Sequence, residues 1–519
     1  MSIRLWSVPL GTALRTFDLP MKPGKHPSSS QVTYREVGED YFQKRQLKRF
    51  AGVFHLWALG VGAVISGDFF GWNFGLGAGG FGGLLVATLL ITLMYVGLCF
   101  SIAEMSAAMP HTGGAYSFAR TAMGPWGGYL TGLAENMEYI LTPAVIVVGI
   151  GGYLGAIFET PEAWEPLWWL AAYSVFVGLN IWGVEISFRF SVFITLVALA
   201  ILLVFYCGAL AHFDWQQAFN MEPGEGATQF LPKGWAGIFA AMPFAVWFYL
   251  AIEQLPLAAE EAQKPQRDLP RGIVSGLMTL VFCAFATLIL NAGIAPGAAG
   301  IAQSDEPLFE GFKTIFGEGL GTRVLALIAV AGLVASFHSI IYAYGRQIYS
   351  LSRAGYFPSF LSLTAPRRKT PHVALVFGAL IGYAVALVIH FASPGSAVGA
   401  ALLNMAVFGA VIAYVMQMAS FLRLRKHHAA MKRPYLSPTG VWGAWFASLL
   451  SVMTLLALFI DSSYRHAVLG ALIWFLAGIG YFALFARHRL VKAPEEHFAM
   501  HDGEVPSREL PQDGDAASD

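Results

Sequence analysis

Acidic side chains stand inside long apolar runs of this sequence, where an ionised group is costly. Asp68 lies in the run 51–78, and Glu135 and Glu138 lie in the run 126–158. A carboxylate at the centre of a bilayer costs about 2.5–3.5 kcal/mol on insertion scales, so such groups face a cavity or a partner and not lipid. The spacing of Glu135 and Glu138 places both on one face of a helix, with Asn136 between them. We interpret these acids as candidates to bind an organic ammonium group or to carry a coupling proton.

Each of these acids also has a structural interpretation. Asp68 can accept hydrogen bonds from its own loop and cap the helix that follows, and this role is compatible with a role in binding. Glu135 or Glu138 can pair inside the protein, with Arg189 or His338 as the partner. His338 can itself titrate near neutral pH, although a lone histidine in a helix is more often simply hydrogen-bonded.

Aromatic side chains supply a third kind of chemistry. Trp72, Phe69, Trp247, Phe248 and Tyr249 stand where two predicted helices are interrupted. Aromatic faces attract an ammonium group through a cation–π interaction, so these residues are candidates for the wall of a cation site. Most Phe and Trp residues of the chain have the simpler role of packing or facing lipid.

The composition indicates where such a site would lie. Of 519 residues, 32 are Lys or Arg and 32 are Asp or Glu, so charged residues make up 12% and hydrophobic residues 56%. A globular protein usually has about 25% charged residues. The low charge and high hydrophobic content of this chain therefore exclude a soluble enzyme, a disordered chain and a disulfide scaffold. The net charge of zero argues against nucleic acid as a partner, because phosphate binding needs a basic face. Three cysteines lie in apolar runs and are expected to be small buried side chains, namely Cys99, Cys207 and Cys283.

The apolar runs predict an all-α integral membrane protein. A helix needs about 20 apolar residues to cross a bilayer, and lipid offers no partner for open backbone groups. Twelve runs are long enough to be transmembrane helices: 51–78, 82–109, 126–158, 166–183, 188–211, 234–260, 273–295, 323–351, 372–391, 397–422, 440–460 and 466–486.

The distribution of basic residues predicts the orientation. If the spans alternate from a cytoplasmic N-terminus, about 27 of the 32 Lys and Arg residues fall on the cytoplasmic side. We therefore expect both termini in the cytoplasm, in an inner or plasma membrane. Residues 1–50 show no signal peptide and form a cytoplasmic segment in this prediction. The acidic, Pro-containing segment 487–519 is expected to be a disordered cytoplasmic tail.

Two of the spans do not read as continuous helices. Span one contains the run Gly60–Gly71, rich in glycine and carrying Asp68, and span six contains Pro243 and Pro256. Interrupted helices at matching positions of two halves indicate the central site of a transporter. Because each half has five spans, the second half must be inverted. The predicted parts are a first repeat 51–211, an external loop 212–233, a second repeat 234–422, and two further spans within 423–486. Close helix packing is the structural alternative for the glycines, but it does not explain Asp68.

Several spaced motifs resemble the amino acid–polyamine–organocation superfamily of transporters. They are Ala103-Glu104-Met105, Pro110, Gly113-Gly114 and Tyr116; Ala259-Glu260-Glu261, Pro265, Arg267, Pro270 and Arg271; and Arg346, Tyr349, Arg353, Gly355, Pro358 and Thr370-Pro371. Within that superfamily, residues 60–74 and 132–139 look most like ethanolamine permeases. The resemblance implies a leucine-transporter-like fold: a five-plus-five inverted repeat, with broken helices 1 and 6 and a central site between spans 1, 3, 6, 8 and 10. It also implies secondary active import of ethanolamine by alternating access, driven by ions or the membrane potential.

The resemblance and the residue chemistry together give two sets of candidate residues. The expected substrate-binding residues are Ser66, Gly67, Asp68, Phe69, Glu135, Asn136, Trp247, Phe248 and Tyr249. The residues expected to act in ion coupling or gating are Glu138, Ser336, His338, Ser339, Glu253 and Glu104. Helix capping is the simpler alternative for the last two.

The chain departs from the superfamily pattern at positions that bear on substrate and ion. Asp68 stands where amino-acid carriers have a turn of the Gly-Ser-Gly type, whose free N–H groups suit a substrate carboxylate. A fixed carboxylate there would repel an acid and attract an amine, as in ethanolamine. Some proton-coupled relatives have a lysine in span five, whereas Ala198 stands at the equivalent position here. The coupling ion, proton or sodium, therefore stays open.

Other functions are weighed against this one. An amino-acid or polyamine permease of the same fold is the main alternative. A channel or a membrane enzyme is a weaker one, because no paired histidine ligands or cysteine clusters of metal spacing and no phosphate-binding loop occur in the sequence. We expect no cofactor and no metal site. The expected partners are a small-molecule amine and the lipid bilayer, and the oligomeric state is left open.

Overall fold

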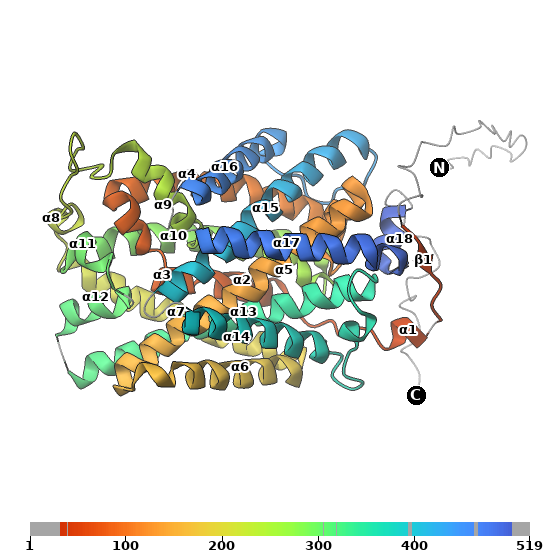
Figure 1. The fold of residues 1–519 in the computed structure, drawn as a ribbon, viewed down its shortest axis with the longest axis horizontal. Coiled ribbons are helices and arrows are strands. Elements are labelled where there is room, and N and C mark those ends of the chain that lie inside the picture. The colour runs from red at the N-terminus through yellow and green to blue at the C-terminus, as the bar shows by residue number, and fades with distance from the viewer. Residues whose placement is uncertain are drawn as a thin grey trace, which may run out of the picture.

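The computed structural model describes residues 32–38, 40–304, 306–317, 319–392, 397–460 and 465–500. In this part of the chain the regular structure is predominantly helical, and the long helices lie side by side along one axis of the molecule (Figure 1). The helical architecture predicted from the apolar runs is confirmed.

Eight of the described helices are long and apolar enough to cross a membrane. They are α4 (Phe74–Ala108), α5 (Gly114–Phe158), α7 (Val184–Leu210), α10 (Pro265–Ala292), α13 (Leu320–Arg353), α15 (Ala397–His427), α16 (Gly440–Ile460) and α17 (Arg465–Leu484). Four further helices lie at the remaining predicted spans: α2 (Val53–Val64), α6 (Glu165–Trp182), α9 (Gly234–Val246) and α14 (His372–Ala392). Large apolar side chains such as Leu203, Leu380 and Trp442 are exposed on the outside of the bundle, as expected of a surface that faces lipid. The count of twelve spans stays a prediction.

The first predicted span is interrupted where glycine is frequent. α2 ends at Val64, and one further turn, α3 (Ser66–Phe69), ends before Phe70, whose backbone is extended. The chain then enters α4, which contains a non-helical residue, Gly80, at a φ of 70°. α4 therefore includes the end of the first predicted span as well as the second span up to Ala108.

The sixth predicted span is interrupted as well. α9 ends at Val246, and a 3-10 helix, η2 (Ile252–Glu261), begins after Ala251, which has a φ of 81°. Pro243 and Pro256 contribute to the irregularity, because each lacks the N–H that a helix needs at that position. The interruptions lie where the sequence predicted them, whereas the inverted repeat that they suggest stays a prediction.

The interrupted segments lie inside the bundle. α2 packs against α7, α10 and α13, and η2 contacts α2, α4, α5, α10 and α13. α5 packs most extensively against α15 and α13. Short elements connect the long ones: α1 (Asp40–Gln43), η1 (Glu162–Trp164), α8 (Trp215–Ala218), α11 (Gly297–Ile301), α12 (Pro307–Phe316) and η3 (Ser359–Ser362).

Both ends of the described chain meet at one end of the bundle. β1 (Tyr34–Arg35) pairs in parallel with β2 (Leu490–Val491), and α18 (Pro494–Met500) lies beside them (Figure 1). We call residues 486–500, which comprise η5 (Ala486–His488), β2 and α18, the C-terminal segment. The prediction of a disordered tail over 487–519 is wrong up to residue 500, because these residues find buried partners on the bundle. Residues 1–31 and 501–519 lie outside the described part.

Candidate functional site

The two interruptions meet backbone to backbone. Gly67 of α3 lies so close to the sixth span that a Cβ atom there would be 2.3 Å from the carbonyl oxygen of Trp247. Trp72 stacks on Phe248, with ring centroids 5.7 Å apart. The structure thus brings together the residues that the sequence placed at the two breaks, and only glycine fits at position 67 without a shift of the backbone.

Phe69 and Tyr249 leave the breaks toward different helices. The Phe69 ring packs on α13 at Gly332, where a Cβ atom would lie 2.3 Å from the ring. The Tyr249 hydroxyl lies 2.6 Å from Oγ1 of Thr92, and its ring lies 5.1 Å from that of Tyr95. These two aromatic residues therefore belong to separate surroundings and not to one wall.

Asp68 faces α10, the predicted seventh span. Its Oδ1 atom accepts a hydrogen bond of 3.0 Å from Thr287 of α10, and Thr287 lies 2.8 Å from the hydroxyl of Tyr206. The side chain is buried, and its Oδ2 atom has no hydrogen-bond partner among the described residues. The helix that follows, α4, has Asn73 at its N-cap position and no side-chain cap, so the predicted capping role of Asp68 is wrong. It also gives Asp68 and Glu135 different partners, so the two predicted ammonium ligands do not share one contact set.

Three carboxyl groups lie together next to the start of η2, just after the break of the predicted sixth span. Glu135 and Glu138 come from α5, Glu253 comes from η2, and all three are buried. Glu138 lies within electrostatic range of both Glu135 and Glu253. The carboxyl oxygens of Glu138 and Glu253 have no hydrogen-bond partner among the described residues, and no ion pair of the described part engages any of the three. We call Glu135, Glu138 and Glu253 the acid cluster.

Neutral polar side chains surround the acid cluster. Gln347 of α13 donates a hydrogen bond of 2.7 Å to Glu135 Oε2, and Tyr139 lies 3.5 Å from the other oxygen. Tyr414 of α15 lies beside Glu253 and 2.9 Å from the hydroxyl of Tyr95. Sequence reasoning missed all of these neighbours. A glutamine in an apolar run was the one signal available, whereas the tyrosines do not stand out among the other aromatic residues.

Asn136, which was predicted to bind substrate, donates to the backbone of its own helix. Its Nδ2 atom donates to the carbonyl oxygen of Gly132 over 2.7 Å, while its Oδ1 atom is buried with no partner among the described residues. The amide oxygen is therefore still free to accept a hydrogen bond from a ligand.

A second set of oxygens lies between α2, α7 and α13. The Ser336 hydroxyl donates to the carbonyl oxygen of Gly62 over 2.8 Å and accepts from the N–H of Ser66 over 2.9 Å. Thr195 approaches from α7 and donates to the backbone of α2. The Ser339 hydroxyl lies next to Gly62 and has no hydrogen-bond partner in the described part of the chain. Hydroxyl and carbonyl oxygens of this kind suit a small hard cation.

His338 is held on the other side of α13. Its Nδ1 atom lies 3.1 Å from Asn180 Nδ2, and its Nε2 atom lies 3.0 Å from Ser187 Oγ. Arg189 pairs with Glu185 over 2.7 Å at the surface. The prediction that Arg189 or His338 could pair with the acids of span three is therefore wrong, and His338 has the hydrogen-bonded role of the simpler alternative.

Glu104 anchors a loop at one end of the bundle. Its Oε2 atom accepts from the N–H of Ser437 over 2.8 Å and pairs with Arg425, and its Oε1 atom lies 3.2 Å from Arg433 Nε. These contacts join the end of α4 to the connection between α15 and α16. The structure does not bring Glu104 to either break.

The described residues contain no group of three or more His, Cys, Asp or Glu side chains placed to hold a metal ion.

Comparison with known families assigns the chain. A family model described as amino acid permease matches residues 55–493. This chain belongs to the amino acid permease family.

Relatives of this permease are transporters, and two of the three described below have different named substrates. An uncharacterized transporter of Rhizobium meliloti is 33% identical over 64% of this chain and 71% of its own length. A branched-chain amino acid permease of Bacillus subtilis is 25% identical over 86% of this chain and 94% of its own length. A D-serine/D-alanine/glycine transporter of Escherichia coli is 26% identical over 70% of this chain and 78% of its own length. Family membership and the apolar helices make this permease a multi-pass membrane protein that transports a small molecule.

Proposed function

We propose that this permease imports ethanolamine, or a small amine like it, by alternating access. The observation that carries the proposal is the acid cluster: Glu135, Glu138 and Glu253 are buried together, and none is paired with a basic side chain of the described part. Buried carboxylates are expensive unless a cation or a proton compensates them. A substrate that carries an ammonium group and no acid supplies that compensation.

The identity of the amine rests on resemblance. The break of the first span and the run that contains Glu135 and Glu138 look most like those of ethanolamine permeases. Ethanolamine enters as a cation, so a potential of 100 mV, negative inside, supplies about 2.3 kcal/mol, or about fiftyfold accumulation, without a coupling ion. The carboxyl groups and aromatic faces at the breaks would offset the loss of hydration of the ammonium group.

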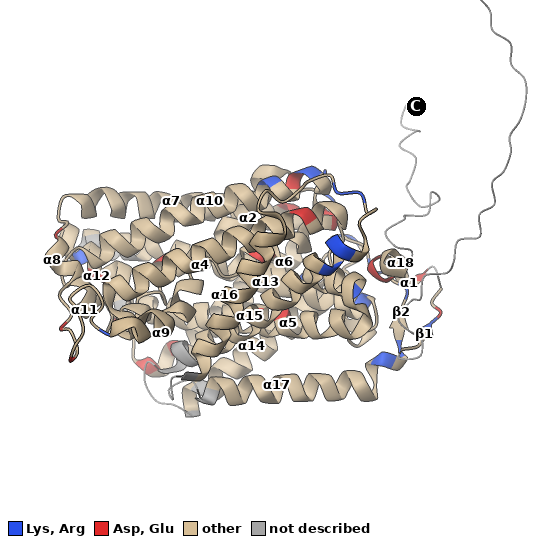
Figure 2. Ribbon diagram, turned by 90° about the horizontal axis from the view of Figure 1, so that it is seen from above, with Lys and Arg blue, Asp and Glu red and all other residues tan. Residues whose placement is uncertain are grey.

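A cytoplasmic location of both chain ends is part of the proposal. Lys and Arg residues gather at the end of the bundle that carries α1, β1 and α18, and are sparse at the opposite end (Figure 2). Loops rich in Lys and Arg stay on the cytoplasmic side of a membrane. We place that end on the cytoplasmic side of an inner or plasma membrane. We also propose that the two five-span blocks have inverted orientations.

The coupling ion, proton or sodium, has two candidate locations. The oxygens of Ser336, Ser339 and the Gly62 carbonyl suit sodium, because hydroxyl and carbonyl groups bind hard cations. Glu138, which has no hydrogen-bond partner among the described residues, is the candidate proton carrier. No cofactor is needed in either case.

Transport of an amino acid is the second candidate function. It is favoured by the branched-chain amino acid permease and the D-serine/D-alanine/glycine transporter among the relatives. It is also favoured by the position of Asp68, whose carboxylate is hydrogen-bonded to Thr287 of α10. A substrate carboxylate at the first break would then meet less repulsion than the sequence alone suggests.

Uptake by the purified permease in proteoliposomes separates these functions. Labelled ethanolamine, serine, alanine and leucine are offered in turn under separately imposed proton, sodium and potential gradients. Saturable accumulation of ethanolamine, larger than that of the three amino acids, supports the proposal and identifies the driving gradient. Accumulation of an amino acid without ethanolamine would assign the alternative.

A further inference from the structure

The C-terminal segment is built into one end of the bundle. β2 is hydrogen-bonded to the C-terminal end of α13, where the N–H of Val491 donates to the carbonyl oxygen of Ala354 over 2.8 Å. Gly355 has a φ of 86°, and a Cβ atom on it would lie 2.4 Å from the carbonyl oxygen of Arg489. Leu490 and Val491 are fully buried. The surface of the bundle thus has a shape that accommodates this segment.

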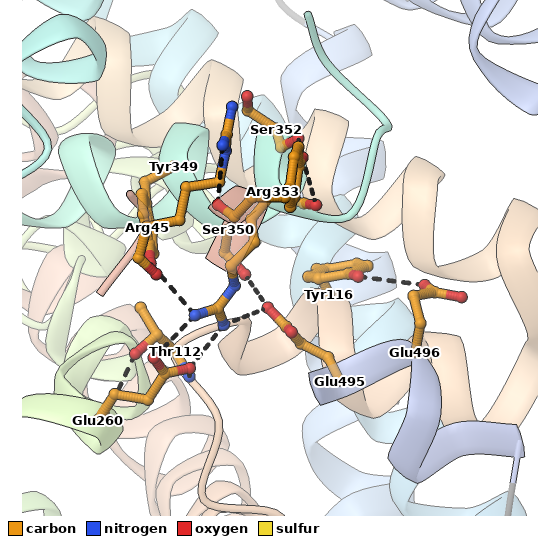
Figure 3. Close-up of polar contacts among 11 residues, drawn as sticks. Arg45, Thr112, Tyr116, Glu260, Tyr349, Ser350, Ser352, Arg353, Glu495 and Glu496 are labelled. Carbon is orange, nitrogen blue, oxygen red and sulfur yellow. Dashed lines mark hydrogen bonds and ion pairs between the residues drawn. The ribbon is translucent and has the colours of Figure 1, made fainter. Parts of the chain in front are cut away.

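Two consecutive carboxylates fasten α18 to the bundle. Glu496 is fully buried and accepts hydrogen bonds from Arg120 Nε over 2.6 Å, from the Tyr34 hydroxyl over 2.8 Å and from the Tyr356 hydroxyl over 2.8 Å. Tyr116 donates to the same carboxylate (Figure 3). Burial, and to a lesser extent the negative charge of Glu496, raise the pKa of the Tyr34 phenol above its ordinary range, so this hydroxyl stays a donor even well above physiological pH.

The other carboxylate joins α18 to a shared arginine. Glu495 is fully buried and lies 2.7 Å from Arg353 Nη2, and it accepts a hydrogen bond of 2.7 Å from Ser350. The same Arg353 binds both oxygens of Glu260, over 2.6 and 2.8 Å, and Glu260 accepts from the N–H of Thr112 over 3.4 Å (Figure 3). One arginine therefore connects α13, η2 and the C-terminal segment.

The elements joined in this way are those that carry the acid cluster and its neighbours. Glu253 and Glu260 both belong to η2, and Gln347 and Arg353 both belong to α13. Glu135 lies on α5, against which α18 packs. Substrate can leave toward this end of the bundle only if these elements separate.

We propose that the C-terminal segment is an internal latch that holds the cytoplasmic end of the transporter closed and is released when the site opens to that side. Charge-assisted hydrogen bonds to buried carboxylates are strong, so their loss shifts the equilibrium between closed and open forms. The latch thus regulates the site described above through the ends of η2, α5 and α13. The direction of transport rests on the proposed function, whereas the closing contact does not.

The test uses Cys99, a buried residue of α4 within electrostatic range of Glu253, as a reporter of opening. The full chain carries Cys207→Ser and Cys283→Ser, and the rate of alkylation of Cys99 by N-ethylmaleimide is measured in membrane vesicles. The double variant Glu495→Gln with Glu496→Gln removes both charges while keeping the size of the side chains. A second variant ends after Lys492, and Glu185→Gln, at an exposed ion pair, is the matched control.

Both latch variants are expected to be alkylated about tenfold faster than the parent, which corresponds to about 1.4 kcal/mol, and the control at the parental rate. If the truncated chain does not fold, the double variant decides. Alkylation of a folded double variant at the parental rate would overturn the proposal, even if the variant melts at a lower temperature. Because this readout needs no substrate, failure of ethanolamine import and failure of the latch are distinguishable.

Discussion

Gly67 and Trp247 touch across the middle of the bundle: a Cβ atom on Gly67 would lie 2.3 Å from the Trp247 carbonyl oxygen. The contact joins the breaks of the first and sixth spans, so a side chain at position 67 must push the two breaks apart. We predict that Gly67→Ala lowers the melting temperature and cuts uptake about fivefold or more, because overpacking costs about 1–3 kcal/mol. Gly77→Ala, where a Cβ atom would have no neighbour closer than 3.9 Å, is the control and should leave both unchanged or slightly raise stability.

We expect two substitutions within the acid cluster to impair transport in different ways. Glu135→Gln should abolish binding and uptake of ethanolamine, because it removes the charge that faces the ammonium group. Glu138→Gln should mainly change the pH dependence of uptake, because Glu138 is the candidate proton carrier. The measurement is the initial rate of labelled ethanolamine uptake between about pH 5 and 9. This interval is about the range in which a perturbed carboxyl group titrates. If both variants keep the affinity and pH profile of the parent, the cluster is structural.

Asp68 is predicted to contribute to the choice between amines and amino acids. Replacement of Asp68 by Asn should weaken ethanolamine uptake and let serine and alanine compete more strongly. Thr287→Val removes the hydrogen-bond partner of Asp68 and keeps the charge, so it should preserve the exclusion of acids. Competition by excess serine and alanine is measured in all three proteins. Strong inhibition of the unmodified protein by either amino acid would show that Asp68 does not exclude acids.

We predict that His111 makes the docking of α18 sensitive to pH. Its ring lies 5.1 Å from that of Phe498, its Nε2 atom is buried without a partner among the described residues, and Glu495, Glu260 and Arg353 are the charged groups that act on it. Burial lowers the pKa of His111. The unfolded chain therefore binds the proton more tightly, so the contribution to stability is complete above the ordinary histidine pKa of about 6.5 and is lost as the pH falls through it.

We accordingly expect the melting temperature in detergent to fall as the pH is lowered from about 7.5 to about 5.5, a range that spans the titration of a free imidazole. His111→Gln should remove part of that fall, whereas the same substitution at the exposed His212 should not. Identical pH profiles of His111→Gln and the parent would contradict this role.

The predicted orientation is open to labelling. With the exposed Cys207 replaced by Ser, a cysteine introduced at Gln266 should be protected from an impermeant maleimide in intact cells, and one at Glu225 should react. Both positions are exposed, Gln266 in the first turn of α10 and Glu225 in the loop between α8 and α9, on opposite sides of the predicted sixth span. Reaction at Gln266 from outside would overturn the topology and the assignment of the latch to the cytoplasm.

Much of the fold was predictable because the signals are local. Long apolar runs force helices in lipid, and Pro243 and the glycines near Asp68 marked where two helices stop. The acid pair Glu135 and Glu138 was recognisable because its spacing defines one helix face. Its third member, Glu253, was expected to act in ion coupling or gating or to cap a helix, but its place beside these acids was not predicted, since a residue near a helix end gives no indication of its tertiary neighbours.

The remaining features depend on contacts between distant parts of the chain. Glu496 binds Tyr34 across 462 positions of sequence, so nothing near either residue reveals the pair. A short acidic stretch reads as a solvated tail unless its buried partners are known. The direction of Asp68 toward Thr287 depends in the same way on how α3 and α10 pack. Periodicity predicts which face of a helix is polar, but not which helix that face meets.

Equilibrium binding of ethanolamine to the purified protein tests the central claim most directly. The measurement compares the unmodified chain with Glu135→Gln, and ethanolamine with leucine, alanine and serine, in calorimetric titrations at one pH and ionic strength. We predict saturable binding of ethanolamine by the unmodified chain, loss of that binding in Glu135→Gln, and weaker or no binding of the three amino acids. Binding of an amino acid in preference to ethanolamine, or unchanged ethanolamine binding by Glu135→Gln, would contradict it.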